Sequence, residues 1–324
     1  MEQCRVAPAI QLTGQILTKP SMTTAVSLII CTRDRARQLD ACLASVAKIR
    51  CDLPWEAVIV DNGSCDETRD VARRFFDNND IRGLYAWEPE PGLSRARNAG
   101  LNVSSGEIAA FTDDDCYPAP DLLDRICEIF ADPRVGFIGG RILLHDPDDY
   151  PLTVNESMET LRFSAGSIVP CAAVQGANMA FRRAALVGIG GFDPALGAGT
   201  PFPAEDWDAA ARVCSDGWDG GYFPAPAVSH HHGRTATAAA SHLRTYHYAS
   251  GAVYAKLLMD RTTRWPYGRH WARRILGDAK YHQRKLVHQF RGAIDYWRSS
   301  RISRPSGPVS VRIVDRALDQ RQDG

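Results

Sequence analysis

The octapeptide FTDDDCYP, residues 111–118, ends a short apolar run that begins at residue 107. The run has the length and composition of a buried β-strand, and the proline favours a turn directly after it. Three adjacent carboxylates, Asp113, Asp114 and Asp115, repel one another unless water or a cation lies among them. Clustered carboxylate oxygens suit a hard divalent cation such as Mg²⁺ or Mn²⁺. Taken alone, such a triplet is more often a solvated acidic turn, so its interpretation depends on the rest of the chain.

The acidic triplet follows the fourth of four similar apolar runs. Residues 25–31, 55–60 and 83–87 are the other three, and each leads into a polar loop and then into apolar residues at helical spacing. Runs of this kind are typical of strands that are buried on both faces. Strands that alternate with helices predict an α/β fold, with a doubly wound, mostly parallel sheet covered by helices on both sides.

Polar side chains gather where these predicted strands end. They include Thr32, Asp34, Asp61 and Arg95, besides the triplet itself. Ligands of such sheets bind in the crevice outside the carboxyl ends of the strands. Polar loops follow strands in any protein, but two acidic groups and one basic group at one edge favour a nucleotide-type site.

Seven short motifs, in this order, resemble family 2 of the GT-A-fold glycosyltransferases, and the match covers about residues 25–234. The motifs are VSLIICT (26–32), VDNGS (60–64), GLSRARNAG (92–100), FTDDD (111–115), GGFD (190–193), ED (205–206) and HHH (230–232). The family uses a nucleotide-sugar donor and a divalent metal, and typically inverts the configuration of the sugar. The resemblance therefore implies a metal-dependent inverting transferase, with a UDP-sugar favoured as donor and a saccharide or lipid-linked hydroxyl as acceptor. It also implies a role in surface polysaccharide or glycolipid assembly.

The resemblance further implies which residues bind the donor. By position, Thr32, Asp34 and Asp61 would line the base and ribose pocket, and Asp61 would accept from an N–H of the base. Arg95 would lie beside the diphosphate. Asp113 or Asp114 would contact the ribose or support the metal ligand.

The same comparison implies a Mn²⁺ or Mg²⁺ site and a general base. Asp115 is the expected metal ligand, with Asp113 as the other end of the DxD motif. The family often has a metal-binding histidine after the last strand of the domain, which leaves His230 and His232 both open. A bound dication would offset the charge that develops on the departing diphosphate.

The pair Glu205 and Asp206 falls where the family has its catalytic carboxylates, and Asp206 takes the position of the general base. Inverting transfer needs one carboxylate on the face of the sugar opposite the diphosphate, to accept the proton of the acceptor hydroxyl. Acidic residues also favour the first turn of any helix, and that alternative has about even odds for the pair by itself.

These patterns divide the chain into segments. Residues 1–24 are expected to be an N-terminal tail in which Met22 could be the true start, and residues 25–235 the catalytic domain. Within the domain, residues 25–140 would form a Rossmann-like nucleotide-binding half and residues 141–235 the acceptor half. A basic helical extension, 236–303, and a disordered tail, 304–324, would follow.

The helical extension carries most of the charge asymmetry of the chain. The whole chain has a formal net charge of zero, which gives no overall field for a nucleic acid partner. Between residues 261 and 304, however, twelve Lys or Arg stand against two Asp, along a stripe of apolar residues from Trp271 to Trp297. The favoured interpretation is a helix or a pair of helices docked on the catalytic domain with a solvated basic face. The alternative is peripheral contact with an anionic membrane.

Cysteine usage and hydropathy indicate the compartment. The nine cysteines show no CxxC pair, and no apolar run reaches the roughly 18 residues of a membrane span. We therefore expect a cytoplasmic protein, at most peripheral to the inner face of the membrane, of unknown oligomeric state.

Two other functions fit parts of the pattern. A sugar-phosphate nucleotidyltransferase also has carboxylates at strand ends, but it would carry a glycine-rich loop after the first strand, and residues 32–35 contain no glycine. A nucleotide-sugar-binding protein without turnover is the second alternative, against which the intact acidic motifs argue.

Overall fold

The structure is a computed structural model that describes residues 24–278, 282–302 and 312–317. The N-terminal tail and Met22 lie outside the described residues. The strands are β1 (Val26–Thr32), β2 (Trp55–Asp61), β3 (Gly83–Trp87), β4 (Ile108–Asp113), β5 (Cys116–Pro118), β6 (Val135–Leu144), β7 (Leu161–Phe163), β8 (Met179–Arg182), β9 (Asp219–His230) and β10 (Arg312–Ala317). The helices are α1 (Ala36–Val46), α2 (Thr68–Asn78), α3 (Leu93–Val103), α4 (Leu122–Phe130), α5 (Arg183–Gly188), α6 (Glu205–Ser215), α7 (Ala236–Met259), α8 (Arg264–Asp278) and α9 (Gln283–Ile302).

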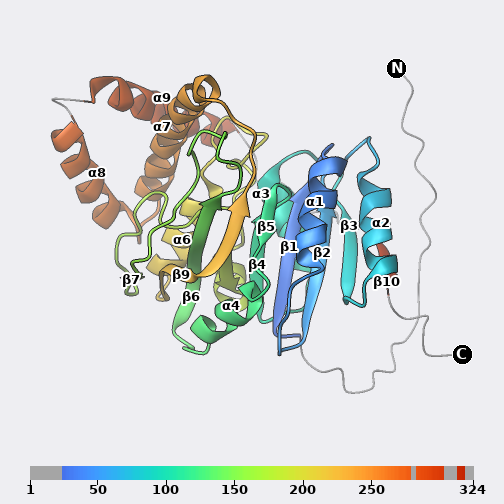
Figure 1. Cartoon of the computed structure of the whole chain (residues 1–324). Helices are drawn as coiled ribbons and strands as arrows, with labels where there is room; N and C mark the ends of the chain where they lie inside the picture. The colour runs from blue at the N-terminus through green and yellow to red at the C-terminus, as the bar shows by residue number, and fades with distance from the viewer. Residues whose placement is uncertain (1–23, 279–281, 303–311, 318–324) are drawn as a thin grey trace, which may run out of the picture.

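One sheet runs through the catalytic domain, with the strand order β10-β3-β2-β1-β4-β8-β6-β9-β5 (Figure 1). Strands β3, β2, β1 and β4 pair in parallel, and so do β6 and β9. Strand β8 enters antiparallel between β4 and β6. The doubly wound, mostly parallel α/β fold predicted from the sequence is confirmed, and the helical C-terminal extension is present.

Successive residues of β1 enter two different cores. Leu28 and Ile30 belong to the core that contains Leu39 of α1, whereas Ile29 belongs to the core that contains Ala96 of α3. Side chains of a strand alternate between the two faces of a sheet, so an unbroken apolar run fits a strand with helices on both sides. This is why the sequence of β1 shows no alternation of apolar and polar residues.

The parallel pairing brings three strand ends to one edge of the sheet. Thr32 at the end of β1 is in register with Asp61 at the end of β2. Cys31 is in register with Asp113 at the end of β4. The convergence of polar strand ends that the sequence predicted is therefore present.

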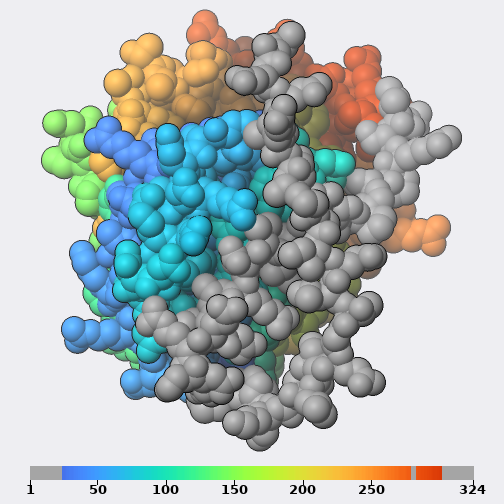
Figure 2. All heavy atoms as spheres, turned by 90° about the vertical axis from the view of Figure 1, so that its right-hand side faces the viewer, coloured from blue at the N-terminus to red at the C-terminus, as the bar shows by residue number. Residues whose placement is uncertain are grey.

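The C-terminal helices attach to the catalytic domain mainly through α7. Helix α7 crosses α9 at close range. An added Cβ at Gly251 of α7 would lie only 1.8 Å from the carbonyl oxygen of Gln289 in α9. From α7, the Lys256 ammonium lies 2.8 Å from Oδ2 of Asp208 in α6 and 2.7 Å from Oδ2 of Asp193. Helices α7, α8 and α9 therefore cover one end of the molecule. Figure 2 faces the opposite end, formed by α2 and the first strands (blue to cyan), with the C-terminal helices behind its upper rim.

One expectation needs correction. Residues 312–317, predicted to be disordered, form β10 and pair antiparallel with the edge strand β3. Strand β9 is continuous from Asp219 to His230. The apolar stripe from Trp271 to Trp297 is divided between two helices, α8 and α9.

Among the described residues, no helix has the length and apolar character needed to cross a membrane.

Candidate active site

A cavity of about 610 Å³ opens at the carboxyl edge of the sheet. Its wall includes the end of β1, the acidic triplet, the first turns of α3 and α6, and two residues of α7, Tyr246 and Ser250. Asp113, Asp115, Asp206 and His230, which are far apart in the sequence, all border this one space.

Each carboxylate of the acidic triplet has a cationic partner inside the protein. Asp113 Oδ1 lies 3.1 Å from an Arg97 nitrogen. Asp114 accepts a hydrogen bond of 2.7 Å from the Thr32 hydroxyl. One terminal nitrogen of Arg35 lies 3.2 Å from Oδ1 of Asp114, and its other terminal nitrogen lies 2.7 Å from Oδ2 of Asp115. Because Asp114 and Asp115 are almost fully buried, the triplet is not a solvated acidic turn.

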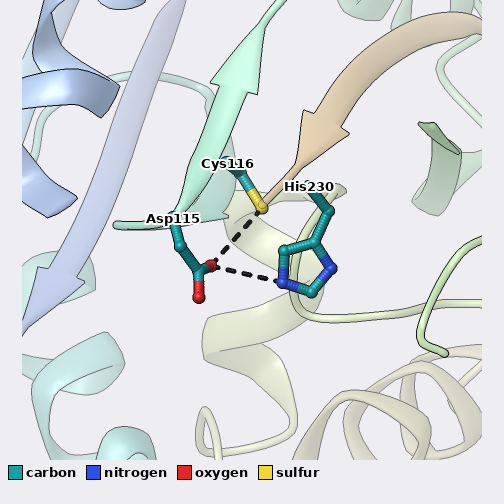
Figure 3. Close-up of side chains that lie close together, drawn as sticks. All are labelled: Asp115, Cys116 and His230. Carbon is teal, nitrogen blue, oxygen red and sulfur yellow. Dashed lines mark hydrogen bonds and ion pairs between the residues drawn. The ribbon is translucent and has the colours of Figure 1, made fainter. Parts of the chain in front are cut away.

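The register of two short strands brings His230 to Asp115. Cys116 of β5 pairs directly with His230 of β9, and Nε2 of His230 lies 3.3 Å from Oδ1 of Asp115. Figure 3 shows the carboxylate directed at both the histidine ring and the Cys116 sulfur, which is 3.9 Å away. Burial opposes ionisation of both partners, but their mutual attraction prevails, so the pKa of Asp115 is lowered and that of His230 is raised.

Asp115 and His230 fit a hard divalent cation. An octahedral ion with bonds of about 2.1 Å has neighbouring ligand atoms about 3 Å apart. Oδ1 of Asp115 and Nε2 of His230 have a similar separation, 3.3 Å. Cys116 completes a group of three possible metal ligands. Burial raises the pKa of its thiol well above the usual value, and a protonated thiol is a poor ligand for a hard cation.

The other candidate histidine has a different environment. Nδ1 of His232 accepts a hydrogen bond of 3.0 Å from the backbone N–H of Arg234 and lies 3.6 Å from Asp149. Its ring nitrogen Nε2 is buried without a hydrogen-bond partner among the described residues. His230 lines the cavity, whereas His232 is not among the lining residues.

Asp206 lies at the start of α6, where backbone N–H groups hold its carboxylate. Oδ2 accepts from the N–H of Gly176 at 2.9 Å and Oδ1 accepts from the N–H of Trp207 at 2.7 Å. Shielding from bulk water, followed by repulsion from Glu205, raises the pKa of Asp206 to about 7. A carboxyl group that titrates near neutrality at a cavity wall has the properties of a general base.

Glu205 has a different partner from its neighbour. It forms a close ion pair with Arg97, whose guanidinium also bonds Asp113 and is 2% exposed. Arg97 thus joins the acidic triplet to the first turn of α6. The sequence prediction selected Arg95, two residues earlier, and missed this role of Arg97; the signal was an arginine on the inner face of α3 among small residues.

Three residues assigned to the donor pocket do not border the cavity among the described residues. Asp61 accepts hydrogen bonds from the Tyr85 hydroxyl at 2.5 Å and from the N–H of Ser64 at 2.7 Å. Asp34 accepts from the N–H of Cys65 at 2.7 Å, which ties the loop after β1 to the loop after β2. Arg95 forms an ion pair of 3.0 Å with Glu90.

Comparison with known proteins identifies the family. The family model described as "Glycosyl transferase family group 2" matches residues 110–303, and that described as "Glycosyl transferase family 2" matches residues 27–187. The chain belongs to the family 2 glycosyltransferases. The resemblance seen in the seven sequence motifs is thereby confirmed, and it extends into the C-terminal helices.

Curated relatives of this glycosyltransferase match over part of their length. Glycosyltransferase AglE of Haloferax volcanii is 34% identical over 118 residues, which are 36% of this chain and 39% of the relative. A PGL/p-HBAD biosynthesis glycosyltransferase of Mycobacterium tuberculosis is 36% identical over 125 residues, 38% of this chain and 43% of that protein. The matched region thus spans about two fifths of these relatives.

Solved structures share the fold of this glycosyltransferase over most of the chain. The mannosyltransferase PcManGT from Pyrobaculum calidifontis, in complex with GDP-Man and Mn²⁺, has a TM-score of 0.59 and 21% identity, covering 89% of this chain and 79% of its own. S. aureus TarS 1-349 in complex with UDP-GlcNAc has a TM-score of 0.57 and 16% identity, covering 84% and 80%. At these identities the likeness establishes the GT-A fold.

Proposed function

We propose that this family 2 glycosyltransferase moves a sugar from a nucleoside diphosphate donor to a hydroxyl acceptor, with inversion and with the help of a divalent cation. The observation that carries the proposal is the common cavity, which Asp206 and the Asp115–His230 pair both border. The titles of the solved neighbours, with GDP-Man and Mn²⁺ or with UDP-GlcNAc, support a nucleotide-sugar donor.

In this proposal Asp206 accepts the proton of the acceptor hydroxyl. The acceptor oxygen then bonds to the anomeric carbon, while the bond from that carbon to the diphosphate oxygen breaks and its electron pair leaves with the diphosphate. A pKa of about 7 keeps a large fraction of Asp206 ionised near neutrality and still leaves it basic enough to take the proton. Glu205 has a positioning role, since its carboxylate is paired with Arg97.

The proposed ligands of Mn²⁺ or Mg²⁺ are Asp115 and His230, with Asp113 as a further oxygen donor at the same wall. When bound, the ion would stabilise the negative charge that develops on the diphosphate. His230 is preferred to His232 because it contacts Asp115 and lines the cavity.

The donor diphosphate needs cations that are not already neutralised. Arg234 lines the cavity, and its guanidinium has no carboxylate within 4.0 Å among the described residues. Arg33 also lines it, and within the described part of the chain its one ion-pair contact is an exposed one of 3.7 Å with Asp34. We assign Arg234 and Arg33 to the diphosphate and give Arg95, which is paired with Glu90, a supporting role.

The nucleoside end of the pocket is assigned to the loops after β1 and β2. Thr32 and Asn62 line the cavity. Asp61 and Asp34 fix these loops through the hydrogen bonds described above and are proposed to act on the base and ribose through that framework. Since the titles of the solved neighbours include both GDP-Man and UDP-GlcNAc, we propose a nucleotide-sugar donor without a preference between these two bases.

The acceptor is assigned to the wall formed by α7, where Tyr246 and Ser250 line the cavity. The names of relatives such as the PGL/p-HBAD biosynthesis glycosyltransferase support a role in glycolipid or surface polysaccharide assembly. The rival proposal is a protein that binds a nucleotide-sugar without turnover.

Two measurements test the proposal. A thermal-shift panel of UDP, GDP and dTDP, with Mn²⁺ or with EDTA, reports donor binding, because a ligand of the native state raises its stability. Transfer or donor hydrolysis is then compared in Asp206→Asn, Asp115→Ala and the control Asp216→Asn, which alters an exposed carboxylate just beyond the same helix. We expect Asp206→Asn to lose transfer but keep donor binding, and Asp115→Ala to lose both. Turnover that survives in Asp206→Asn contradicts the assigned base, and activity undiminished by excess chelator contradicts the metal.

A further inference from the structure

Helix α9 has an apolar stripe on its outer side. Val287, Phe290, Ile294 and Trp297 are 48%, 43%, 47% and 43% exposed. Their spacing of three or four residues puts them along one side of the helix. The inner side is occupied by the buried residues Leu286, Gln289, Ala293 and Tyr296, so the stripe is additional to the packing against α7.

Helix α8 contributes a second apolar stripe. Trp265 and Leu276 are 66% and 78% exposed, and a separation of eleven residues, about three turns, puts them on one side of the helix. The two helices meet where Trp271 packs on Phe290, with ring centroids 5.4 Å apart. The exposed sides of α8 and α9, named here the α8–α9 face, carry six large apolar side chains between them, of which the four on α9 lie along one line.

Arginines flank the apolar stripe of α9. On α9, Arg284, Arg291 and Arg298 recur every seven residues on the exposed side, next to Val287 and Ile294. Arg284 and Arg291 form no ion pair with a described residue, and Arg298 has only a long contact of 3.9 Å with Asp295. The described part of the chain therefore leaves these charges largely without a neutralising partner.

The charge of the segment that contains α8 and α9 also orients the molecule. Residues 261–304 contain twelve Lys or Arg and two Asp, an excess of ten positive charges, in a chain whose net charge is zero. The rest of the chain therefore has an excess of ten negative charges. An anionic surface attracts this end of the molecule and repels the remainder.

We propose that the α8–α9 face lies on an anionic lipid membrane, with its tryptophans and aliphatic side chains in the headgroup region and its arginines on the lipid phosphates. Apolar stripes flanked by basic residues are the features of helices that lie in the interfacial plane. A second copy of the chain is a poorer occupant, because a two-fold interface would bring the same positive charges together.

This orientation brings the cavity close to the membrane surface. Ser250 of α7 lines the cavity, and its hydroxyl accepts a hydrogen bond of 3.0 Å from Gln289 on the inner side of α9. Packed helix axes are about 8–10 Å apart, so a single helix layer separates the proposed membrane contact from the cavity wall. The membrane contact itself does not depend on the proposed chemistry of that cavity.

The test is sedimentation of the full chain with vesicles, which reads binding and not turnover. Wild type is expected to pellet with phosphatidylcholine vesicles containing 30% phosphatidylglycerol, and to stay in solution with phosphatidylcholine alone. The triple variant R284Q/R291Q/R298Q is expected to lower the partition coefficient about a hundredfold, since each basic residue near the surface contributes about a fivefold effect. The control R69Q/R73Q/R74Q removes the same charge from the exposed side of α2, at the opposite end of the molecule, and is expected to bind as wild type.

A second pair of variants separates apolar insertion from charge alone. V287S/I294S is expected to weaken binding about tenfold, whereas L161S/V187S, which alters comparably exposed apolar residues elsewhere, is expected to have no effect. Circular dichroism establishes that each variant is folded. Four outcomes would overturn the proposal. Wild type could pellet equally with both vesicle types, or not at all. The α9 and α2 triple variants could lose binding equally, or the protein could be a dimer that V287S/I294S dissociates.

Discussion

Substitution of Arg97 tests whether the site is held together by a buried ion network. Arg97 is 2% exposed and is the cation between Glu205 and Asp113. Its guanidinium also lies over the Phe192 ring, 5.7 Å from the centroid. In Arg97→Met, the buried Glu205 has no counter-charge and must either ionise at high cost or take up a proton.

The expected loss of stability follows from that burial. Breaking a buried ion pair by removing one partner costs about 3–5 kcal/mol. For a chain of 324 residues, with an unfolding entropy of about 2.1 cal/mol/K per residue, this corresponds to a fall in Tm of about 4–7 °C. Arg125→Met is the matched control, because Arg125 pairs with Asp121 and Glu128 on the surface, and it is expected to unfold close to wild type.

A double-mutant cycle separates the ion pair from lost packing. In Arg97→Met/Glu205→Gln, position 205 carries no charge and needs no counter-charge. The loss of unfolding free energy in the double variant is therefore expected to be at least about 1 kcal/mol smaller than the sum of the two single losses. The assay is urea unfolding at pH 7.5 followed by circular dichroism, with thermal unfolding as a second measure. If Arg97→Met unfolds like wild type, or if the two single effects simply add, the Arg97–Glu205 pair does not stabilise the site as argued.

Three further outcomes are expected. Burial raises the pKa of Asp206 to about 7, and the base must be ionised to accept a proton. The value of kcat/KM for transfer is therefore expected to fall as pH decreases through 7. A flat profile between pH 5.5 and 8 would exclude this base. Arg35→Gln removes the cation that lies 2.7 Å from Asp115 and competes with a metal ion for that carboxylate. Mn²⁺ is therefore expected to bind the donor-free protein about tenfold more tightly, as measured by an electron paramagnetic resonance titration. Weaker binding would argue against Asp115 as a ligand. Lys256→Met removes one of two cations from the fully buried Asp208 and is expected to cost about 2–4 kcal/mol in urea unfolding, a loss that would not appear if the contact were solvent-screened.

Much of the site could be predicted because it consists of strand ends. The sequence identifies β1, β2 and β4 as buried strands, and the rule that parallel strands share a carboxyl edge then brings Thr32, Asp61 and Asp113 together. The start of a helix at Glu205 and Asp206 was one of the two interpretations of that acidic pair, and α6 begins there. These inferences needed only local patterns and the geometry common to all such sheets.

Contacts between distant residues could not be predicted in this way. Arg97 and Glu205 are 108 positions apart, and nothing local distinguishes Arg97 from Arg95 except the face of α3 on which it lies. Asp61 looked free to bind a nucleobase, but Tyr85 of the neighbouring strand donates to it.

The chain by itself determined its fold class, its family and the acidic, basic and histidine motifs, because these are written in runs of a few adjacent residues. The tertiary structure alone decided that His230 and not His232 faces Asp115, because this depends on the pairing of Cys116 with His230 across β5 and β9. It also decided that, although both border the cavity, Glu205 is paired with Arg97 whereas backbone N–H groups hold Asp206. Side chains one or two positions apart point in different directions, and only the packed structure determines which of them meets the site.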